Sequence, residues 1–249
     1  MHSPAAPINA ATQLMHDVCR QLGDLDILDL SQDALASVRI IQLRRLARRI
    51  ETVIPGHFGH GERTAHYALL IAEHIGLDRR RCLELHYGAL LHDVGLLTLP
   101  RHLLDALTPP ASNDFALLQS HPREGAALLV AVSFLCKPAR IIAHHHEGWD
   151  GAWYPYGLRG VYIPVEARIL ALADAFDTLA SRSTSWHTAR RTLLASGGSQ
   201  FDPELCAAFC DLLDDPAAHR RSGNSAPFSP CITQGPEASR PATATLRML

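Results

Sequence analysis

Apolar segments with helical spacing follow one another along most of this chain. In each segment, apolar residues recur at intervals of three and four, as they do on one face of an α-helix. Turns containing Pro or Gly separate the segments, and no convincing alternating strand pattern lies between them. The segments span residues 10–23, 31–53, 63–76, 80–91, 113–129, 138–146, 164–180 and 203–213. Since each helix must bury its apolar face against another, we expect an all-α helical bundle.

The distribution of these segments divides the chain into three parts. Residues 55–214 hold most of the predicted helices and are numerous enough to form one hydrophobic core. Residues 1–54 contain two predicted helices and are expected to form a helical N-terminal extension. Residues 215–249 are rich in Ala, Ser, Pro and Arg and lack apolar periodicity, so we expect this tail to be disordered.

Composition argues against two classes of protein. A net charge of −2 and an isoelectric point near 6.7 do not suit a protein that binds long nucleic acids through a basic surface. No segment is long and apolar enough to cross a bilayer, and the N-terminus lacks the pattern of a signal peptide. We therefore expect a cytoplasmic protein. The six cysteines form no Cys-x-x-Cys pair and are interpreted as reduced thiols.

Histidine is frequent, with fifteen in the chain, and it is the commonest metal ligand. The pair His92-Asp93 ends an apolar helix. Alone, such a pair is typical of a core histidine followed by a capping aspartate. Further His and Asp residues fall near predicted helix ends or inward faces, however: His60, His121, His145, His146 and Asp174. Together these imidazoles and carboxylates suit Mn, Fe, Co, Ni or Zn.

Asp174 strengthens the prediction of a metal site. Leu170, Leu172, Ala173 and Phe176 flank it, and a buried carboxylate without a partner is costly. A metal ion would satisfy that charge. Two metal ions about 3.5–4 Å apart are a recognised means of phosphoryl chemistry, because they lower the pKa of bound water and stabilise charge on phosphoryl oxygens. The ligand set is therefore consistent with cleavage of a phosphate ester.

Several ordered motifs extend this pattern across about residues 55–213. They are Gly59-His60-Gly61-Glu62-Arg63, Leu90-Leu91-His92-Asp93-Val94-Gly95, His121-Pro122 with Gly125, His144-His145-His146-Glu147-Gly148-Trp149-Asp150-Gly151, Tyr154-Pro155, Gly157-Leu158-Arg159-Gly160, Asp174-Ala175-Phe176-Asp177 and Gln200-Phe201-Asp202-Pro203. On these motifs the chain resembles the HD-GYP domains, a branch of the HD phosphohydrolase superfamily. The resemblance implies an HD-type helical bundle that hydrolyses the bacterial second messenger cyclic di-GMP to pGpG or GMP.

The resemblance also implies which residues carry the chemistry. Divalent transition metals, with Fe or Mn as first candidates, would be bound by His60, His92, Asp93, His121, His145, His146 and Asp174. Asp93 would bridge two ions and act with His92 in catalysis, and Tyr154 would contact the substrate. Some family members bind a third metal through a Glu one helical turn before the first His. That position is Gly56 here, so two ions are expected.

Three more residues are expected to surround the ligands. By the same resemblance, Glu147 and Asp150 would orient the ligands and the loop that follows them. His144, the first of three consecutive histidines, is either a packing residue or another orienting group. None of these three side chains is expected to bind metal.

The chain departs from the family pattern at positions that serve the substrate. Leu96 replaces the lysine of His-Asp-x-Gly-Lys, and Trp153 replaces the glycine of Gly-Tyr-Pro. Trp153 either packs within its loop or offers a stacking face to guanine. An ungapped alignment places Ser183 where the family has an arginine. Other arginines would then have to bind the phosphates, the candidates being Arg101, Arg123, Arg159 and Arg182.

The sequence motifs are compatible with two functions. The first is a metal-dependent phosphodiesterase of HD-GYP type, with weak turnover, acting on cyclic di-GMP or a related guanine nucleotide. The second is a regulatory or interaction module that keeps the metal site without efficient turnover. An HD hydrolase for another phosphate monoester or nucleotide fits less well, because Tyr154-Pro155 and the following loop are specific to this branch. In either case a homodimer or a signalling partner would bind through the N-terminal helices.

Overall fold

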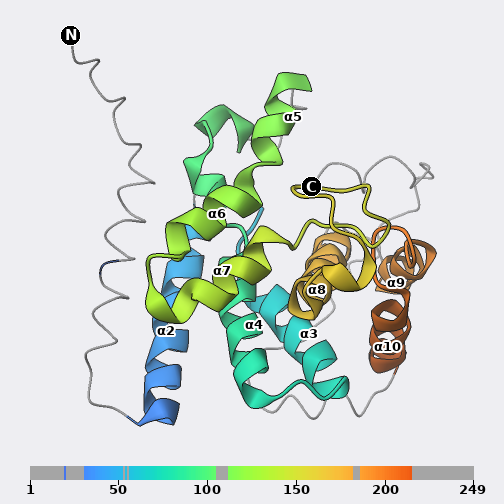
Figure 1. Cartoon of the computed structure of the whole chain (residues 1–249), viewed down its shortest axis with the longest axis horizontal. Coiled ribbons are helices and arrows are strands. Elements are labelled where there is room, and N and C mark those ends of the chain that lie inside the picture. The colour runs from blue at the N-terminus through green and yellow to red at the C-terminus, as the bar shows by residue number, and fades with distance from the viewer. Residues whose placement is uncertain are drawn as a thin grey trace, which may run out of the picture.

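In the part of the chain that the computed structural model describes, the regular elements are all helices, which confirms the predicted fold class (Figure 1). The described residues are 20, 31–52, 54, 56–104, 112–181 and 186–214. The helices are α2 (Gln32–Glu51), α3 (His60–His74), α4 (Arg79–Leu91), α5 (Ser112–Leu118), α6 (His121–Leu129), α7 (Cys136–Ala143), α8 (Val165–Ser181), α9 (Trp186–Ala195) and α10 (Pro203–Asp214). The 3₁₀ helices between them are η2 (Val94–Thr98), η3 (Arg101–Leu103), η4 (Ser133–Leu135) and η5 (Gly160–Tyr162).

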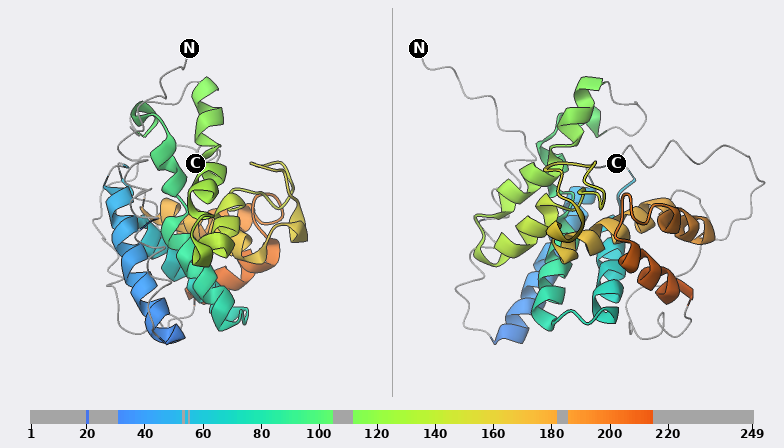
Figure 2. Two further views of the ribbon diagram at one scale, coloured as in Figure 1. Left: turned by 60° about the vertical axis from the view of Figure 1, so that its left-hand side comes forward. Right: turned by 45° about the vertical axis from the view of Figure 1, so that its right-hand side comes forward.

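A hairpin of α3 and α4 forms the centre of the bundle. The helix α8 packs along α3, while α7 and α2 pack against α4. The helix α6 lies against α7 and η2, and α9 and α10 pack against each other and against α8. In all views α2 lies on the opposite side of the bundle from α9 and α10, and α5 projects away from it (Figures 1 and 2). One core thus holds together the helices whose ends form the candidate site.

Local capping signals start two of these helices. The Ser31 side chain accepts a hydrogen bond from the N–H of Ala34 at 3.3 Å, and the Asp78 carboxylate accepts one from the N–H of Arg81 at 3.0 Å. Each satisfies an N–H group that has no partner inside its own helix. Packing then fixes the helices in place. The largest fully buried side chains include Leu43, Ile71, Leu85, Leu129, Phe176 and Phe209.

The helix α2 shares this hydrophobic core. Its residues Leu43, Leu46 and Ile50 are buried, and α2 contacts both α3 and α4. Ile41, by contrast, is 50% exposed. The predicted boundary near residue 54 therefore lies between elements that share a core, and it stays a prediction.

Some predicted helices have different limits in the structure. The segment 113–129 was expected to be one helix but forms α5 and α6, with a break at residues 119–120. Pro122 explains the break, because proline clashes with a preceding helical turn but is tolerated in the first turn of a new helix. The segment 138–146 stops being helical after Ala143. The helix α9 was not predicted.

Several predictions concern residues outside the described part of the chain. They include the tail at 215–249, Arg182, Ser183 and the helix at 10–23, of which residue 20 alone is described. The side chain of Arg101 is also outside it. Among the helices that are described, none combines the length and apolarity needed to cross a membrane.

Candidate metal centre

One group of predicted ligands combines two helix ends with the middle of a third helix. His60 is the first residue of α3, His92 directly follows α4, and Asp174 lies within α8. His60 Nε2 lies 3.2 Å from His92 Nε2 and 3.1 Å from Asp174 Oδ1. His92 Nε2 lies 3.7 Å from the same oxygen. These three residues, called site A below, could hold one metal ion, because their ligand atoms all lie within 4.8 Å of one another.

A second group consists of imidazoles alone. His121 is the first residue of α6, and His145 and His146 lie in the turn after α7. The His121 ring centroid lies 5.4 Å from that of His145 and 4.9 Å from that of His146. The centroids of His145 and His146 are 4.0 Å apart. One ligand nitrogen from each again lies within 4.8 Å of the others, so these residues, called site B below, could hold a second ion.

Asp93 lies between the two sites. Its Oδ2 atom is 3.2 Å from His92 Nε2 and 3.7 Å from His60 Nε2, both in site A. Its Oδ1 atom is 3.6 Å from His121 Nε2 in site B. The carboxylate therefore directs one oxygen to each site, as a bridging ligand requires.

Backbone hydrogen bonds fix how three of the histidines present their nitrogens. Nδ1 of His92, His121 and His145 lies 2.9, 2.7 and 2.6 Å, respectively, from the carbonyl oxygen three residues earlier. A carbonyl can only accept, so Nδ1 carries a proton, and in the neutral ring Nε2 has the lone pair. The imidazoles are thus held in the tautomer that a metal ligand needs.

The unsatisfied polar atoms of site B provide a test of whether a metal ion fits. Nε2 of His121 and of His145 are buried and have no hydrogen-bond partner among the described residues. A buried polar atom without a partner costs about 1–3 kcal/mol. A divalent cation would satisfy both lone pairs, so the donor set fits a metal ion.

Carboxylates raise the pKa values of the histidines in site A. Burial opposes a positive charge on His60, but hydrogen bonds to Asp174 and Asp177 outweigh it and raise the pKa of His60 to about 9. The pKa of His92 is also raised despite burial, through Asp93 and Asp174. The histidines in turn hold the pKa values of Asp93 and Asp174 well below the usual range, although burial acts in the opposite direction. Site A therefore favours protonated histidines beside ionised carboxylates.

Site B favours neutral histidines. Burial, together with the neighbouring His121, lowers the pKa of His146 to about 3. Burial also lowers the pKa of His145 well below its ordinary value, and that of His121 as well. All three imidazoles are consequently unprotonated near neutral pH, with lone pairs available to a metal.

Asp177 and Arg63 support site A, and the sequence did not assign them a role there. The Asp177 carboxylate accepts a hydrogen bond from His60 Nδ1 at 2.7 Å, which directs His60 Nε2 toward the site. Arg63 donates to both oxygens of Asp177, at 2.7 and 3.0 Å. A carboxylate behind a ligating histidine is a common way to orient the ring. The spacing Asp174-x-x-Asp177 on one helix was the available signal, since it places both carboxylates on one face.

Two other residues near site A were also missed. His57 Nε2 lies 3.6 Å from Asp93 Oδ2, and its ring meets the His60 ring edge-on at 5.3 Å between centroids. Glu51, the last residue of α2, is buried and bonds to the backbone on either side of His60. Neither role can be read from the sequence, because each depends on how separate segments pack.

Two glycines explain how the turn after α4 comes close to α6. A Cβ atom at Gly95 would overlap the carbonyl oxygen of His121 and lie 2.7 Å from the amide nitrogen of Gly125. A Cβ at Gly125 would in turn lie 3.0 Å from the amide nitrogen of Gly95. Only glycine allows this approach. It brings Asp93 next to His121 and so joins site A to site B.

The loop after the histidine turn is organised by Glu147. This buried carboxylate accepts hydrogen bonds from the N–H groups of Tyr156 and Leu158, at 2.7 and 2.8 Å. Tyr154 is in the same loop, and its ring centroid lies 5.0 Å from that of His146. Glu147 therefore bonds to the backbone of the loop that carries Tyr154, and its role in orienting the ligands stays a prediction.

Asp150 and His144 lie outside the two metal sites. Asp150 is exposed, and its carboxylate accepts a hydrogen bond from the N–H of Ala152 at 2.9 Å. His144 Nδ1 lies 3.8 Å from a Glu147 oxygen, and its ring packs against that of Tyr156. These contacts give Asp150 a place in the loop turn and His144 a packing position.

A family model described as HD domain matches residues 44–205. The chain belongs to the HD domain family. It is 37% identical over 194 residues to the cyclic di-GMP phosphodiesterase response regulator RpfG of Xanthomonas campestris pv. campestris, covering 73% of this chain and 51% of the relative. It is 32% identical over 205 residues to a cyclic di-GMP phosphodiesterase of Vibrio cholerae, covering 74% of this chain and 42% of the relative. These relatives confirm the resemblance drawn from the sequence motifs, although the chain spans only about half their length.

A solved structure shows the same HD-type fold. The crystal structure of a cyclic GMP-AMP specific phosphodiesterase from Vibrio cholerae matches with a TM-score of 0.59 at 21% identity. The match covers 71% of this chain and 50% of that chain. At this identity the likeness concerns the fold alone.

Two residues that depart from the HD-GYP motifs, Leu96 and Trp153, pack against other parts of this HD domain. Leu96 packs against the hydrophobic core, and a Cβ at Gly148 would overlap the indole of Trp153. Both replacements therefore take part in packing. Of the arginines expected to bind phosphate, Arg159 is exposed, and Arg123 is exposed beside Glu124 at 3.3 Å.

Proposed function

We propose that this chain is a metal-dependent phosphodiesterase that hydrolyses cyclic di-GMP to pGpG or GMP. The position of Asp93 carries the proposal, because each of its oxygens faces a different candidate metal site. A carboxylate placed in this way can bind two ions at once, which is the arrangement used in two-metal phosphoryl chemistry. Membership of the HD domain family and the named activities of the relatives support the reaction class.

The proposal assigns two divalent transition-metal ions, Fe or Mn, to sites A and B. Such ions polarise phosphoryl oxygens and lower the pKa of bound water. The side chains of both sites would hold these ions, and Asp93 would be a ligand shared by the two sites. The backbone carbonyls behind His92, His121 and His145, and Asp177 behind His60, keep the Nε2 lone pairs pointing inward.

Tyr154 is assigned to substrate contact. Its ring packs near His146 of site B, with 5.0 Å between centroids. Burial and the charges of Asp174 and Asp93 raise the pKa of its hydroxyl group. The hydroxyl thus keeps its proton at neutral pH and can donate a hydrogen bond to a phosphoryl oxygen. Arg159 and Arg123 stay candidates for the remaining phosphate contacts.

The test is an assay of the purified protein loaded with Mn or Fe, incubated with cyclic di-GMP, with the products separated by chromatography. We expect pGpG or GMP to form, and to disappear in the Asp93→Ala variant. Asp33→Ala is a matched control, because it removes an exposed carboxylate of α2 far from both sites in the sequence. Turnover that is equal in the native protein and Asp93→Ala would refute the proposal.

A second candidate function is a regulatory module that keeps the metal site without efficient turnover. The packing of Leu96 against the core favours it, since the family's phosphate-binding lysine is replaced by an apolar side chain. The same assay separates the two functions. Full metal content with no detectable product would support the regulatory module.

The substrate could also be a related guanine nucleotide. The relatives include 3'3'-cGAMP-specific phosphodiesterases from Vibrio cholerae, so 3'3'-cGAMP belongs in the same assay. We assign the chain to whichever dinucleotide gives the higher kcat/KM. Preference for a phosphate monoester over both would exclude this branch of the family.

Self-association through the N-terminal helices is also proposed. The apolar residues Leu43, Leu46 and Ile50 of α2 are buried within the chain itself, and Ile41 is its exposed large apolar side chain. Light scattering of the native protein and of Ile41→Glu tests this contact. A strict monomer in both would remove it.

A further inference from the structure

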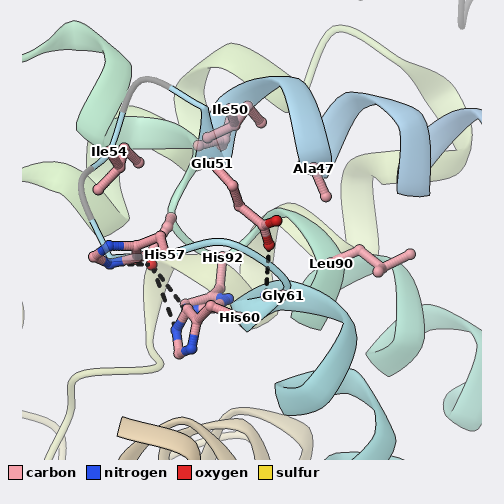
Figure 3. Close-up of a pocket in the computed structure, with 11 residues that line it drawn as sticks. Ala47, Ile50, Glu51, Ile54, His57, His60, Gly61, Leu90 and His92 are labelled. Atoms are coloured by element: carbon pink, nitrogen blue, oxygen red, sulfur yellow. Dashed lines mark hydrogen bonds and ion pairs between the residues drawn. The ribbon is translucent and has the colours of Figure 1, made fainter. Parts of the chain in front are cut away.

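The carboxylate of Glu51 connects α2 to the start of α3. Its Oε2 atom accepts a hydrogen bond from the N–H of Gly59 at 2.7 Å, and its Oε1 atom accepts one from the N–H of Gly61 at 2.9 Å. These two residues flank His60, a ligand of site A. Figure 3 shows the Glu51 side chain reaching from α2 to Gly61, with His60 and His92 nearby. Glu51 is 8% exposed, so these bonds are shielded from water.

The start of α3 depends on this carboxylate because it has no cap of its own. The first N–H groups of a helix lack partners inside the helix and form its positive end. The residue preceding α3 is Gly59, at φ +74°, and it has no side chain with which to cap the helix. Glu51 provides the missing acceptor from another helix, and a charged acceptor strengthens the bonds.

Gly61 keeps the same region close to α4. A Cβ atom there would lie 3.0 Å from the carbonyl oxygen of Leu90 and 3.3 Å from Glu51 Oε1. The absence of a side chain thus lets the beginning of α3 approach both Glu51 and the end of α4. That approach brings His60 Nε2 to 3.2 Å from His92 Nε2.

We propose that Glu51 is a positioning residue of site A. By holding the amides on both sides of His60, it fixes the backbone from which this imidazole projects, and it makes metal affinity at site A depend on the position of α2. Site B does not share this dependence, since Glu51 has no hydrogen bond to α6 or to the turn after α7 among the described contacts. The inference rests on metal binding, which is part of the proposed function.

A small cavity next to Glu51 bears on the choice of substitution. It has a volume of about 20 Å³ and is lined by Glu51, His57, His60, His92 and Asp93, among others. That is room for about one water molecule. Truncation by Glu51→Ala would enlarge the cavity and admit water, which could cap the amides without fixing their position. Glu51→Gln keeps the volume but leaves one oxygen acceptor for two N–H groups.

The experiment measures Mn²⁺ affinity at each site separately. His121→Ala disables site B and reports on site A, whereas Asp174→Ala disables site A and reports on site B. In the His121→Ala background we expect Glu51→Gln to weaken Mn²⁺ binding by about tenfold or more, as loss of an orienting partner commonly does. In the Asp174→Ala background the change should be less than about twofold, and Glu51→Ala should repeat this asymmetry.

Glu62→Gln is the matched control, because Glu62 joins the same two helices through an exposed pair with Arg48 at 3.1 Å. We expect it to leave both affinities unchanged. Equal weakening of the two sites by Glu51→Gln would show a general structural role and overturn the proposal, as would unchanged affinity at site A. If Mn²⁺ binds with the expected asymmetry but no cyclic dinucleotide is hydrolysed, the proposed function fails while the role of Glu51 stands.

Discussion

Sites A and B would hold their metal ions in opposite electrostatic settings. Site A pairs His60 and His92 with the carboxylate of Asp174, and the pKa of His60 is raised to about 9. Site B contains imidazoles alone, and burial lowers the pKa of His146 to about 3. A metal ion must therefore displace protons to enter site A, whereas site B presents free lone pairs.

This difference shows how one bridging carboxylate can serve both sites. Asp93 stays ionised because the histidines around it lower its pKa, despite its burial. Its charge raises the pKa of His92 in site A and opposes the effect of burial on His121 in site B. A substitution of Asp93 should thus change the metal affinity of both sites. A substitution of a residue that supports the ligands of one site should change the metal affinity of that site alone.

The largest contrast is expected in the pH dependence of metal binding. Below a pKa of about 9, His60 is protonated, so binding at site A releases a proton and strengthens as pH rises. One released proton gives about a tenfold gain per pH unit, or about a hundredfold between about pH 6.5 and 8.5. Site B histidines have lowered pKa values, so binding there should be nearly flat over this range.

Mn²⁺ titrations of the His121→Ala and Asp174→Ala variants at several pH values measure these two dependences. Proton release can be followed in parallel by calorimetry in buffers of different ionisation enthalpy. A steeper pH dependence of Mn²⁺ affinity at site B than at site A would contradict the proposed difference between the sites.

The next largest difference is expected in how one substitution, Asp177→Asn, changes Mn²⁺ affinity at the two sites. Asp177→Asn removes the carboxylate behind His60 and leaves Arg63 without its ionic partner. We expect Mn²⁺ affinity at site A to fall by about ten- to a hundredfold, with little change at site B. Asp202→Asn is the matched control, since Asp202 is also buried and bonds to an arginine, Arg168, at 2.6 Å.

The two aspartate variants are compared by Mn²⁺ titration and thermal unfolding together. Both should lower the unfolding temperature, because each removes the buried charge that pairs with an arginine, Arg63 or Arg168. Only Asp177→Asn should change metal affinity. If Asp202→Asn weakens site A as strongly, the effect of Asp177 is one of general stability.

A smaller effect is expected on turnover when a phosphate-binding side chain is restored at position 96. Leu96→Lys restores the family's lysine next to Asp93, and a charge-assisted hydrogen bond to phosphate is worth about 1.5–3 kcal/mol. We expect kcat/KM for cyclic di-GMP to rise by about tenfold or more, and further when Ser183→Arg is added. Leu96→Met controls for the change in packing. Native turnover already equal to that of the relatives, with no gain from lysine, would show that other groups bind the phosphates.

The smallest effect is expected from the C-terminal tail. Residues 215–249 lack apolar periodicity, so their removal should bury or expose little apolar surface. Truncation after Asp214 should change the midpoint of thermal unfolding by less than about 2 °C. A drop of many degrees would show that the tail packs on the bundle.

The sequence predicted most of the helices, for identifiable physical reasons. Apolar periodicity marks the buried faces of α3, α4 and α8, and candidate ligands such as His60 and His92 stand out because they occur at helix ends. The break before Pro122 was missed because the apolar pattern continues through it. Trp186–Ala195 forms α9 and was also missed, although Ala189 and Leu193, one helical turn apart, are buried on one face of it.

The supporting residues could not be predicted in the same way. Glu51 belongs to α2 and bonds to Gly59 and Gly61, eight and ten positions farther along the chain, so these contacts appear only when the helices pack. His57 looks like an ordinary loop histidine until the fold brings it 3.6 Å from Asp93. Asp177 was visible in a motif, but its partner His60 lies 117 residues away along the chain.

The most direct test of the two-site arrangement is a crystal structure of the Mn²⁺-loaded protein with anomalous diffraction data. We predict two anomalous peaks, one at His60, His92 and Asp174 and the other at site B, with an oxygen of Asp93 bound to each. A single peak, or two peaks of which only one contacts Asp93, would contradict the bridging role on which the proposed function rests.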